Sequence, residues 1–443
     1  MRREESGGTS AQFQILVIGG GASGMTAAVA AARKGASVCI CDRMDRVGKK
    51  LLATGNGRCN LSNKDLYQGQ SPPEQYISNN LDVAASILSQ YGWRFTLQFF
   101  ESLGLFATIE ENTRIYPRTY QASSVLDALR AEMAALYVVE RCSAEAVEIL
   151  KTEAGFTTQI AESVPTGSGS AAKASNKTHL SFIQSGKVII AAGGCAFPSL
   201  GSNGSGYALL KKYGHRLITP TPGLVQLRLE ADGVRGLKGV RIDAKITLTL
   251  DNDTNLYQET GELIFSDSGV SGIPVLNASL RLPAKLEKNQ PCWLKIDLLP
   301  EYSDDTILEI FNDRRQAHAN RPMESLLSGL IHKKLTFPIL RSAQIAHAHR
   351  NIGSLSDQEL RRLPSILKGW RHKIDGTAGF DQAQITKGGL SLGEFDRTTL
   401  ESKKIPGVYA AGEILDVAAF CGGYNLQWAW ASGFLAGSAA AAL

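Results

Sequence analysis

The sequence of 443 residues has no apolar stretch near the roughly 20 residues that a membrane span requires, so it predicts no membrane partner. No basic run is longer than two residues, and the formal net charge is only +5. This weak, scattered charge predicts that nucleic acid is not a partner. Residues 1–12 are polar and charged with no apolar segment behind them, which predicts a flexible leader rather than a secretory signal.

Paired cysteine motifs are also missing. The seven cysteines are widely separated and no Cys-x-x-Cys pair occurs, so neither a zinc ribbon nor a redox dithiol is expected. The one close histidine pair, His347 and His349, has no acidic residue nearby, and we interpret it as part of a solvated helix face. We therefore expect no metal site, and a reduced protein located in the cytoplasm.

Glycine and alanine are abundant instead. The 44 glycines favour close backbone packing, as in α/β nucleotide-binding folds, and the length suits two to four domains. The apolar run Phe13–Ile18 has the length of a parallel strand buried on both faces. A glycine-rich turn, an alanine-rich helix over Met25–Lys34 and a second apolar strand, Ser37–Cys41, follow it. This order predicts a complete βαβ unit.

The turn of this unit carries the dinucleotide fingerprint Gly-x-Gly-x-x-Gly. Gly19 permits the tight turn, Gly21 lets the backbone approach a diphosphate, and Gly24 lets the helix pack on the strand. The helix N-terminus then directs free N–H groups and a partial positive charge at the phosphates. Asp42 follows Gly19 by 23 residues, near the spacing of the acid that holds ribose hydroxyls. A plain tight turn is the alternative, and the strand, helix and acid around the glycines disfavour it.

Further elements are expected before and after Thr219, where the hydrophobic pattern of the sequence changes. Before it we predict mixed helix over Gln75–Gly104, an amphipathic helix over Gln121–Ala135, and short strands at Ala144–Ile149, Gly155–Ile160, His179–Gln184 and Lys187–Ala192. After it, antiparallel strands are expected at Val225–Leu229, Gly239–Leu250 and Leu256–Ile264, with helices at Asp304–Lys334 and Asp357–Trp370. A strand at Val408–Ala411 and a helix over Tyr424–Leu443 complete the prediction.

These elements predict one α/β domain that is interrupted by inserts. The domain takes residues 13–218 and 377–443, a β-rich insert takes 219–290 and 340–376, and a helical insert takes 291–339. Residues 161–178, rich in Ser, Gly, Ala and Lys, are expected to be flexible, like 1–12.

The chain has one fingerprint and returns to its α/β domain in separated pieces, which suits an elongated cofactor such as FAD. Its adenine end would lie on the first βαβ unit. Glu413, next to the strand-end glycine Gly412, could accept hydrogen bonds from ribityl hydroxyls. The helix that follows Gly422-Gly423 would direct its positive N-terminus at the pyrimidine end of the flavin and stabilise the reduced anion.

Six segments together resemble the BaiN-like flavoproteins, a family of FAD-dependent oxidoreductases that includes aminoacetone oxidases and dehydro-bile-acid reductases. They include GKKLLATGNGRCNLSN at 48–63, AAGGCAFPSLGSNGSGYALLKKYGH at 191–215 and GVYAAGEILDVAAFCGGYNLQWAWASG at 407–433. The resemblance implies a Rossmann-like, two-dinucleotide-type FAD-binding domain interrupted by a β-barrel-like insert and a small helical insert. Four positions depart from the family pattern, and we place them near the substrate side: Ser205, Ser266-Asp267, Lys387 and Ala418-Ala419.

The fingerprint and the resemblance together give the residues expected to contact FAD. They are Gly19, Gly21, Ala22, Ser23, Gly24, Asp42, Arg43, Gly48, Lys49, Lys50, Thr54, Gly55, Arg58, Cys59, Asn60, Val147, Ala192, Gly193, Gly412, Glu413, Gly423, Tyr424, Asn425 and Leu426.

The candidate catalytic residues are Arg58, Tyr116 and Arg118. The arginines could anchor an anionic or carbonyl substrate or a nicotinamide phosphate, and structural ion pairing is the alternative. Tyr116 could donate a proton, although packing with a satisfied hydroxyl is the stronger interpretation. Cys59 and Cys421 lack the spacing of a flavin-linked disulfide, so packing or a role in a turn is expected for both.

The function expected from these features is hydride transfer through flavin N5, with NADH or NADPH as reductant and a small-molecule carbonyl or enone as substrate. An oxygen-using amine oxidase of the aminoacetone type is the alternative within the same class. A flavin-dependent RNA-modifying or redox-sensing protein is less favoured, because a basic tract is missing. The sequence leaves the oligomeric state open.

Overall fold

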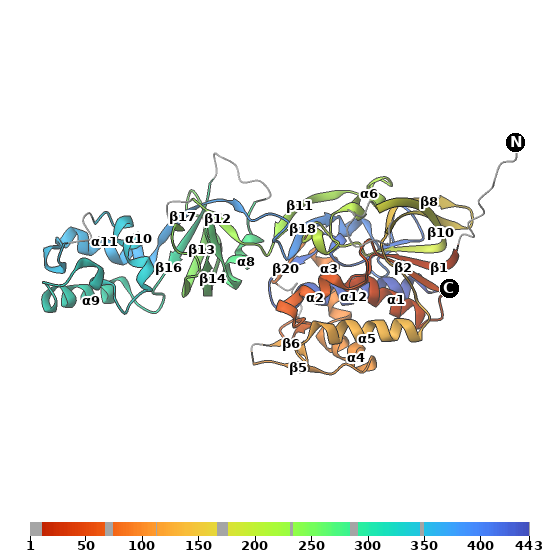
Figure 1. Ribbon diagram of the computed structural model, residues 1–443, viewed down its shortest axis with the longest axis horizontal. Coiled ribbons are helices and arrows are strands. Elements are labelled where there is room, and N and C mark those ends of the chain that lie inside the picture. The colour runs from red at the N-terminus through yellow and green to blue at the C-terminus, as the bar shows by residue number, and fades with distance from the viewer. Residues whose placement is uncertain are drawn as a thin grey trace. The chain divides into compact units, whose positions relative to one another are not determined.

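The computed structural model describes residues 11–66, 74–111, 113–165, 176–230, 234–283, 291–345 and 350–442 (Figure 1). The chain forms two compact units. The first, which we call the α/β unit, comprises Met1–Thr221 and Ile385–Leu443, and the second, the barrel unit, comprises Pro222–Gln384. Within the described part of the chain, no helix combines the length and the apolar character that crossing a bilayer demands. The pair His347 and His349 lies outside the described residues.

The α/β unit is built on a seven-stranded sheet. Its strands lie in the order β7 (Val139–Arg141), β2 (Val38–Cys41), β1 (Ala11–Ile18), β10 (Asn176–Ile190), β9 (Gly155–Pro165) and β8 (Ala144–Thr152), and β19 (Val408–Ala410) pairs with β10. The pairs from β7 to β10 and the pair β10–β19 are parallel, whereas β9 and β8 are added antiparallel. All four residues of β2 are buried, as expected for a strand covered on both faces.

The predicted βαβ unit is confirmed, with one correction. Helix α1 (Ala22–Ala32) begins directly after Gly21 rather than at Met25. Its first turn is Ala22-Ser23-Gly24, which carries no apolar pattern and therefore looks like loop in the sequence. The consequence matters for the site, because the fingerprint glycines stand at the N-terminus of the helix itself.

The strands predicted at His179–Gln184 and Lys187–Ala192 are one strand, β10, and the flexible loop predicted at 161–178 is wrong at both ends. Ala161 to Pro165 continue β9 and pair with Asn176 to Leu180 of β10. Ser185-Gly186 resembles a turn in sequence, but β9 pairs with β10 up to Ser185 and β1 pairs with it on to Ile190. The two partners thus overlap and carry the strand through the glycine. Residues 166–175 lie outside the described residues.

Further helices and three small sheets, β11–β18, β20–β4 and β3–β6–β5, complete the described part of the α/β unit. They are α2 (Lys49–Ala53), a 3₁₀ turn (Thr54–Gly57), β3 (Ser62–Asn63), β4 (Tyr76–Ile77), α3 (Leu81–Gln90), α4 (Trp93–Ser102), β5 (Ala107–Ile109), β6 (Arg114–Pro117), α5 (Ala122–Ala135), α6 (Ser205–Lys211), β11 (Leu217–Gly223), β18 (Ile385–Leu390), β20 (Ala418–Ala419) and α12 (Tyr424–Ala440). The helices predicted at Gln121–Ala135 and Tyr424–Leu443 are confirmed as α5 and α12.

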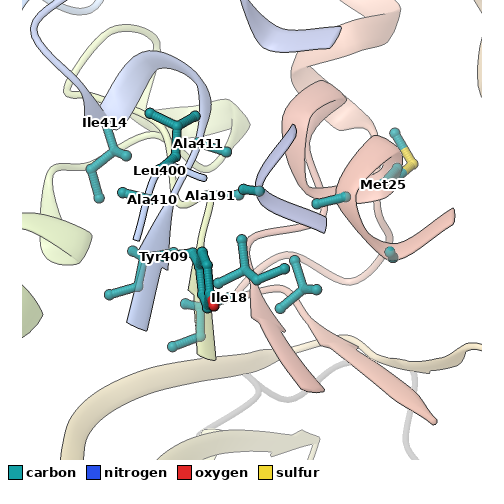
Figure 2. Packing of buried hydrophobic residues seen from close by; sticks show 14 of the residues in the cluster. Ile18, Met25, Ala191, Leu400, Tyr409, Ala410, Ala411 and Ile414 are labelled. Carbon is teal, nitrogen blue, oxygen red and sulfur yellow. The ribbon is translucent and has the colours of Figure 1, made fainter. Parts of the chain in front are cut away.

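The core lies where the ends of β1, β10 and β19 meet α1 (Figure 2). Ile18, Met25 and Tyr409 are buried there beside small residues at 191, 410 and 411. Alanines at these strand ends let backbones approach closely, because they add little volume. Trp428 and Trp430 of α12 are buried, and their indole N–H groups donate to the carbonyls of Gly412 and Leu61 at 3.1 and 3.0 Å.

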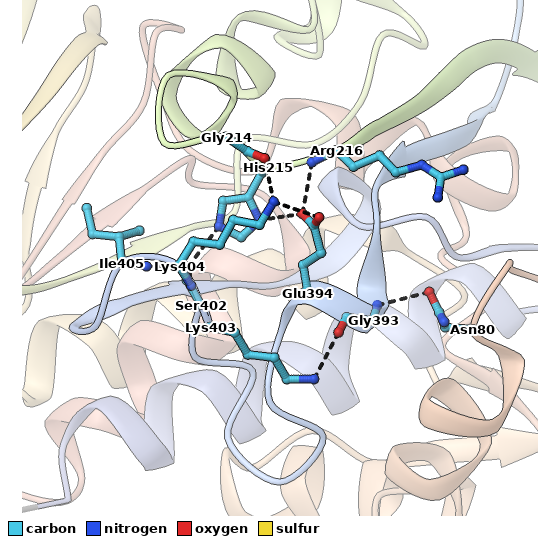
Figure 3. Close-up of polar contacts among 10 residues, drawn as sticks. All are labelled: Asn80, Gly214, His215, Arg216, Gly393, Glu394, Ser402, Lys403, Lys404 and Ile405. Carbon is cyan, nitrogen blue, oxygen red and sulfur yellow. Dashed lines mark hydrogen bonds and ion pairs between the residues drawn. The ribbon is translucent and has the colours of Figure 1, made fainter.

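A buried polar network joins the connection between α6 and β11 to the segment 391–405 (Figure 3). The His215 Nε2 atom lies 2.7 Å from Ser402 Oγ, and its Nδ1 atom lies 3.1 Å from Glu394 Oε2. A serine, histidine and carboxylate in line is also the arrangement of hydrolase triads. Here Ser402 is 3% exposed and its oxygen accepts bonds from the backbone N–H groups of Lys404 and Ile405. The network therefore stabilises the fold, and Ser402 is not accessible to a substrate.

The barrel unit contains a closed antiparallel barrel. Its strands lie in the order β12 (Leu227–Leu229), β15 (Gly269–Ser271), β14 (Asn255–Phe265), β13 (Arg241–Leu250), β16 (Cys292–Asp297) and β17 (Trp370–Thr377), and β17 closes on β12. Alternate residues of β16 are buried, which fits a strand with one face toward the barrel interior. The helices of the unit are α8 (Ile273–Ser279), α9 (Asp304–Ala317), α10 (Thr336–Ser342) and α11 (Asp357–Lys368).

The antiparallel strands of this unit and the helix predicted at Asp357–Trp370 are confirmed. The helix predicted at Asp304–Lys334 ends at Ala317, and the segments assigned to the two inserts also need correction. Strand β16 falls within 291–339, which we assigned to a helical insert, and α11 falls within 340–376, which we assigned to the β-rich insert. Helices α9, α10 and α11 form one excursion between β16 and β17, two strands that pair with each other. The hydrophobic pattern of the sequence indicates where helices occur, but it does not indicate which two strands flank them in the barrel.

His372 of β17 gives the barrel unit a stability that depends on pH. Its ring packs against Trp370 with 4.2 Å between centroids, and its Nε2 atom has no hydrogen-bond partner among the described residues. Burial lowers its pKa from 6.5 to about 4. Between these two values the unfolded chain binds a proton that the folded unit does not. The free energy of unfolding therefore has its full value above pH 6.5 and decreases as pH falls toward 4.

Between pH 7 and pH 4, protonation of His372 should lower the free energy of unfolding of the wild type by about 3 kcal/mol. We expect His372→Phe to abolish this decrease. Urea titrations of the wild type and the variant at both pH values measure this difference. Equal pH dependence in the two proteins would show that His372 is not the responsible group.

Candidate active site

The fingerprint glycines differ in what surrounds them. Gly19 has φ +104°, and a Cβ placed there would overlap the carbonyl of Ala191. A Cβ at Gly24 would overlap the carbonyl oxygen of Gly19. At Gly21 no atom lies within 4 Å of that position, and its φ of −82° and ψ of −170° suit any residue. Gly19 and Gly24 are therefore required by the fold, whereas the space beside Gly21 is open to a ligand.

Asp42 holds the glycine loop from the end of β2. Its Oδ2 atom accepts a hydrogen bond from Gly20 N at 2.7 Å, and its Oδ1 atom accepts one from Met44 N at 2.8 Å. Burial raises the pKa of this carboxyl, while the two backbone bonds oppose the shift. The predicted ribose acid thus stands beside the loop, with part of its bonding capacity already used by the backbone.

A pocket opens beside this loop, between the ends of β1, β2 and β8 and the start of α6. Three of the predicted cofactor residues line it: Gly19, Arg43 and Ala192. The sequence analysis missed its other lining residues, which are Ile18, Cys41, Ala144, Glu145, Ala146, Ser205, Gly206 and Leu209. No motif marks the β8 residues, because they reach the pocket only through sheet pairing. Val147 is 45% exposed on β8 and is not among the lining residues.

Ser205, which we expected near the substrate side, begins α6 and lines the pocket that also contains Gly19 and Arg43.

Three segments that are far apart in sequence meet around Glu413. Its Oε2 atom accepts from Lys50 Nζ at 2.8 Å, and its Oε1 atom accepts from Thr386 N at 2.8 Å. The preceding residue, Gly412, has φ +79°, and a Cβ there would overlap Ser23 Oγ of α1. The structure therefore brings the predicted residues Ser23, Lys50, Gly412 and Glu413 into one cluster. Gly193 precedes Gly194, whose added Cβ would lie 3.1 Å from Glu413 Oε1.

The loop that leads into α2 and the 3₁₀ turn contains most of the remaining predicted residues. Gly48 caps α2 with φ +77°, and Gly55 has φ +57°. Lys49 Nζ pairs with Asp45 Oδ1 at 2.6 Å, so it faces away from the Glu413 cluster. Thr54 Oγ1 donates to Leu51 O at 2.6 Å and is used in closing the turn.

The N-terminus of α12 meets the end of this loop at Asn60. Gly423 has φ +95°, and a Cβ there would lie 2.7 Å from Asn60 Oδ1 and 2.5 Å from Ser62 O. Asn60 is 9% exposed, and its Oδ1 atom has no hydrogen-bond partner among the described residues. The Asn425 side chain, in contrast to that of Asn60, has hydrogen-bond partners. Its Oδ1 atom accepts from Ala419 N at 2.9 Å, and its Nδ2 atom donates to Ala419 O at 2.7 Å.

Tyr424 and Leu426 secure this helix start. The Tyr424 ring packs edge-on to Tyr76 with 6.0 Å between centroids, and Tyr76 Oη donates to Tyr424 O at 2.7 Å. Burial raises the pKa of Tyr424 to about 12, with a smaller contribution from the Asp65 charge. Leu426 packs against the hydrophobic core. These contacts position the helix. Because its pKa is raised, Tyr424 remains a neutral phenol at ordinary pH.

These features fit an elongated dinucleotide with a polar ring at one end. The space beside Gly21 at the head of α1 suits a diphosphate, because N–H groups and the helix dipole point there. The buried, unpartnered Asn60 Oδ1 beside the N-terminus of α12 calls for a hydrogen-bond donor, and a flavin ring carries one. No cluster of three or more metal-binding side chains occurs in the ranges that the structure describes.

Of the three catalytic candidates, the structure brings two together. The Arg58 guanidinium lies over the Tyr116 ring at 4.9 Å, and Tyr116 is buried. Arg58 itself is exposed and adjoins the Cys59-Asn60 corner. Arg118 is exposed just after β6, where its backbone N–H donates to Phe106 O. A planar cation is therefore supported by an aromatic ring next to Asn60.

Cys59 is a packing residue, as predicted. It is fully buried, and burial raises the pKa of its thiol to about 12. Cys421 is only partly buried, and neither cysteine is part of a disulfide bond. Because thiolate is the reactive form, we expect Cys59 to resist iodoacetamide at pH 8 in the folded protein and to react only after denaturation. Peptide mass mapping measures this, and rapid native labelling of Cys59 would contradict the assignment.

Comparison with known proteins places this geometry in a family. A family profile described as "HI0933-like protein Rossmann domain" matches residues 13–439. The chain is 38% identical over 436 residues to the 3-dehydro-bile acid delta(4,6)-reductase of Clostridium scindens, with 97% of this chain and 99% of the relative covered. It is 30% identical over 428 residues to the ribosomal RNA dihydrouridine synthase of Escherichia coli, with 95% and 96% covered.

A solved structure shares the fold. The 3-ketosteroid delta1-dehydrogenase from Sterolibacterium denitrificans matches 98% of this chain and 100% of its own at a TM-score of 0.50, with 12% identity. The predicted fold class, a Rossmann-like domain with a barrel insert and a helical insert, is confirmed. The expectation of an enzyme is confirmed as well. The chain therefore belongs to the HI0933-like family, the BaiN-like flavoproteins that its motifs resemble, and is a FAD-dependent oxidoreductase.

Proposed function

We propose that this chain reduces a carbon–carbon double bond conjugated to a carbonyl, with NADH or NADPH as reductant. The observation that carries the proposal is the exposed Arg58 cation, held over Tyr116 beside the unpartnered Asn60 and the N-terminus of α12. Reduction of a conjugated alkene builds negative charge on the carbonyl oxygen. A permanently charged guanidinium is well suited to bind that oxygen and stabilise the charge.

In this proposal each residue has a limited task. Bound FAD would supply the hydride chemistry. Lys50, Glu413 and Ser23 would position its ribityl and diphosphate region, and Asn60 would accept a hydrogen bond from the ring. Arg58 would orient the substrate carbonyl through its planar donors. The Tyr116 ring would restrict the guanidinium to one plane, as its 4.9 Å approach indicates.

The names of the two curated relatives support the same reaction class. One is a delta(4,6)-reductase of a dehydro-bile acid, and the other forms dihydrouridine in ribosomal RNA. A uracil ring also has a double bond conjugated to a carbonyl, so both products follow from one kind of reduction. The second relative makes a uracil in RNA a second candidate substrate for this chain. The sequence-based expectation that nucleic acid is not a partner is consequently not supported.

An anaerobic titration tests the proposal. The purified protein is expected to show an oxidised flavin spectrum that NADH or NADPH bleaches and that a 4-en-3-one steroid or another conjugated enone restores. A parallel assay in air measures peroxide release from small amines. Such release, without anaerobic oxidation of the reduced flavin by enones or uridine-containing RNA, would support the amine-oxidase alternative and overturn the proposal.

A further inference from the structure

The barrel unit carries a basic groove at its helical part. A hollow of about 600 Å³ is lined by residues from three separate segments. Arg235 and Gly236 come from the connection after β12, and the 3₁₀ turn Lys333–Leu335 and helix α10 provide most of the other side. We use the name basic groove for Arg235, Lys333, Lys334, Phe337 and Arg341. Glu324 is the one acid among its lining residues.

The cations of the basic groove are uncompensated. Arg235, Lys333, Lys334 and Arg341 are all exposed, and among the described residues none of their side chains has an ion-pair or hydrogen-bond partner. By contrast, two lysines of the barrel unit are paired: Lys295 lies 2.9 Å from Asp253, and Lys368 lies 2.8 Å from Asp297. Four like charges around one hollow repel each other, and a polyanion would relieve that repulsion.

The groove also presents an aromatic ring to solvent. Phe337 of α10 is 46% exposed, although Ile339 and Leu340 of the same helix are buried in the core. A phenyl ring left exposed among unpaired cations offers a flat apolar surface next to a phosphate-binding surface. Single-stranded nucleic acid combines the two matching features, because each base has a stacking face and each nucleotide carries one phosphate.

From these observations we infer that the basic groove binds a single-stranded segment of RNA, with phosphates on the cations and a base on Phe337. This inference rests on the proposed function with a uracil in RNA as the substrate. It adds a surface that would recruit the RNA that carries the uracil. The sequence showed no basic tract because Arg235 and the segment 333–341 are about a hundred residues apart. Only the fold places them around one hollow.

The test is equilibrium binding of the full-length protein to a fluorescein-labelled, uridine-rich RNA 12-mer, followed by anisotropy at several KCl concentrations. Replacing both lysines, Lys333→Ala with Lys334→Ala, is expected to weaken binding and to lower the slope of log K against log [KCl] by about 0.7 for each lysine. Phe337→Ala is expected to weaken binding about tenfold and to leave the slope unchanged. The matched control Arg361→Ala removes an exposed cation of α11 that does not line the groove, and should change neither quantity.

Wild-type affinity and slope in the double-lysine variant would overturn the inference. Competition by polyaspartate as strong as that by unlabelled RNA would also overturn it, because the groove would then be a general anion surface. The reduction of a free enone by the same variants separates the two proposals. If enone reduction persists while RNA binding is insensitive to the groove, only the groove assignment fails.

Discussion

We expect Gly21→Val to fold normally and to lose FAD. No atom lies within 4 Å of the added Cβ and the backbone there is extended, so the fold itself accommodates the side chain. The valine would occupy the space in which the backbone approaches the diphosphate. We expect the Kd for FAD to rise about 100-fold, equivalent to about 3 kcal/mol of binding free energy. Fluorescence titration of flavin-stripped protein measures this, and thermal unfolding without FAD checks the fold.

Gly24→Ala is the contrasting control within the same loop. Its Cβ would overlap the Gly19 carbonyl, so the apoprotein itself should unfold at a lower temperature. The pair separates a ligand-facing glycine from a packing glycine three residues away. Unchanged FAD affinity in Gly21→Val would show that the open space beside Gly21 is not the diphosphate site.

The first βαβ unit could be predicted from the sequence because its determinants are local. A buried strand, three glycines and a helix follow each other between Ala11 and Ala32. The structure displays a steric reason for Gly19 and Gly24, whereas the space beside Gly21 is open. The start of α1 was misplaced because Ala22-Ser23-Gly24 carries no apolar periodicity. Local patterns predict elements well and their first turn poorly.

The rest of the site depends on contacts across long stretches of chain. Lys50 and Glu413 are 363 residues apart, and Asn60 meets Gly423 only because α12 starts beside β3. The resemblance to a family pointed to these residues, and spacing alone could not. Glu145 and Leu209 were missed because pocket lining from β8 and α6 follows from sheet order, which no motif encodes.

Arg58→Ala should reduce kcat/KM for an enone about 100-fold and leave the bound flavin in place. The guanidinium is exposed, and its ring contact with Tyr116 orients it without burying it. If it stabilises charge on the carbonyl oxygen in the transition state, its removal lowers kcat and kcat/KM together. Steady-state kinetics with NADH or NADPH, alongside flavin content from the visible spectrum, measure both quantities.

Arg58→Lys and Tyr116→Leu separate charge from geometry in the same site. Lysine keeps the positive charge but loses the planar donors and the stacking on Tyr116, so we expect about a tenfold loss rather than a hundredfold one. Tyr116→Leu removes the ring beneath an intact guanidinium, and a loss of similar size would identify Tyr116 as a positioning residue. An equal loss in Arg58→Ala and Arg58→Lys would mean that the fork of donors carries the effect. Full activity in Arg58→Ala would assign the carbonyl to another residue and remove the observation on which the proposed function rests.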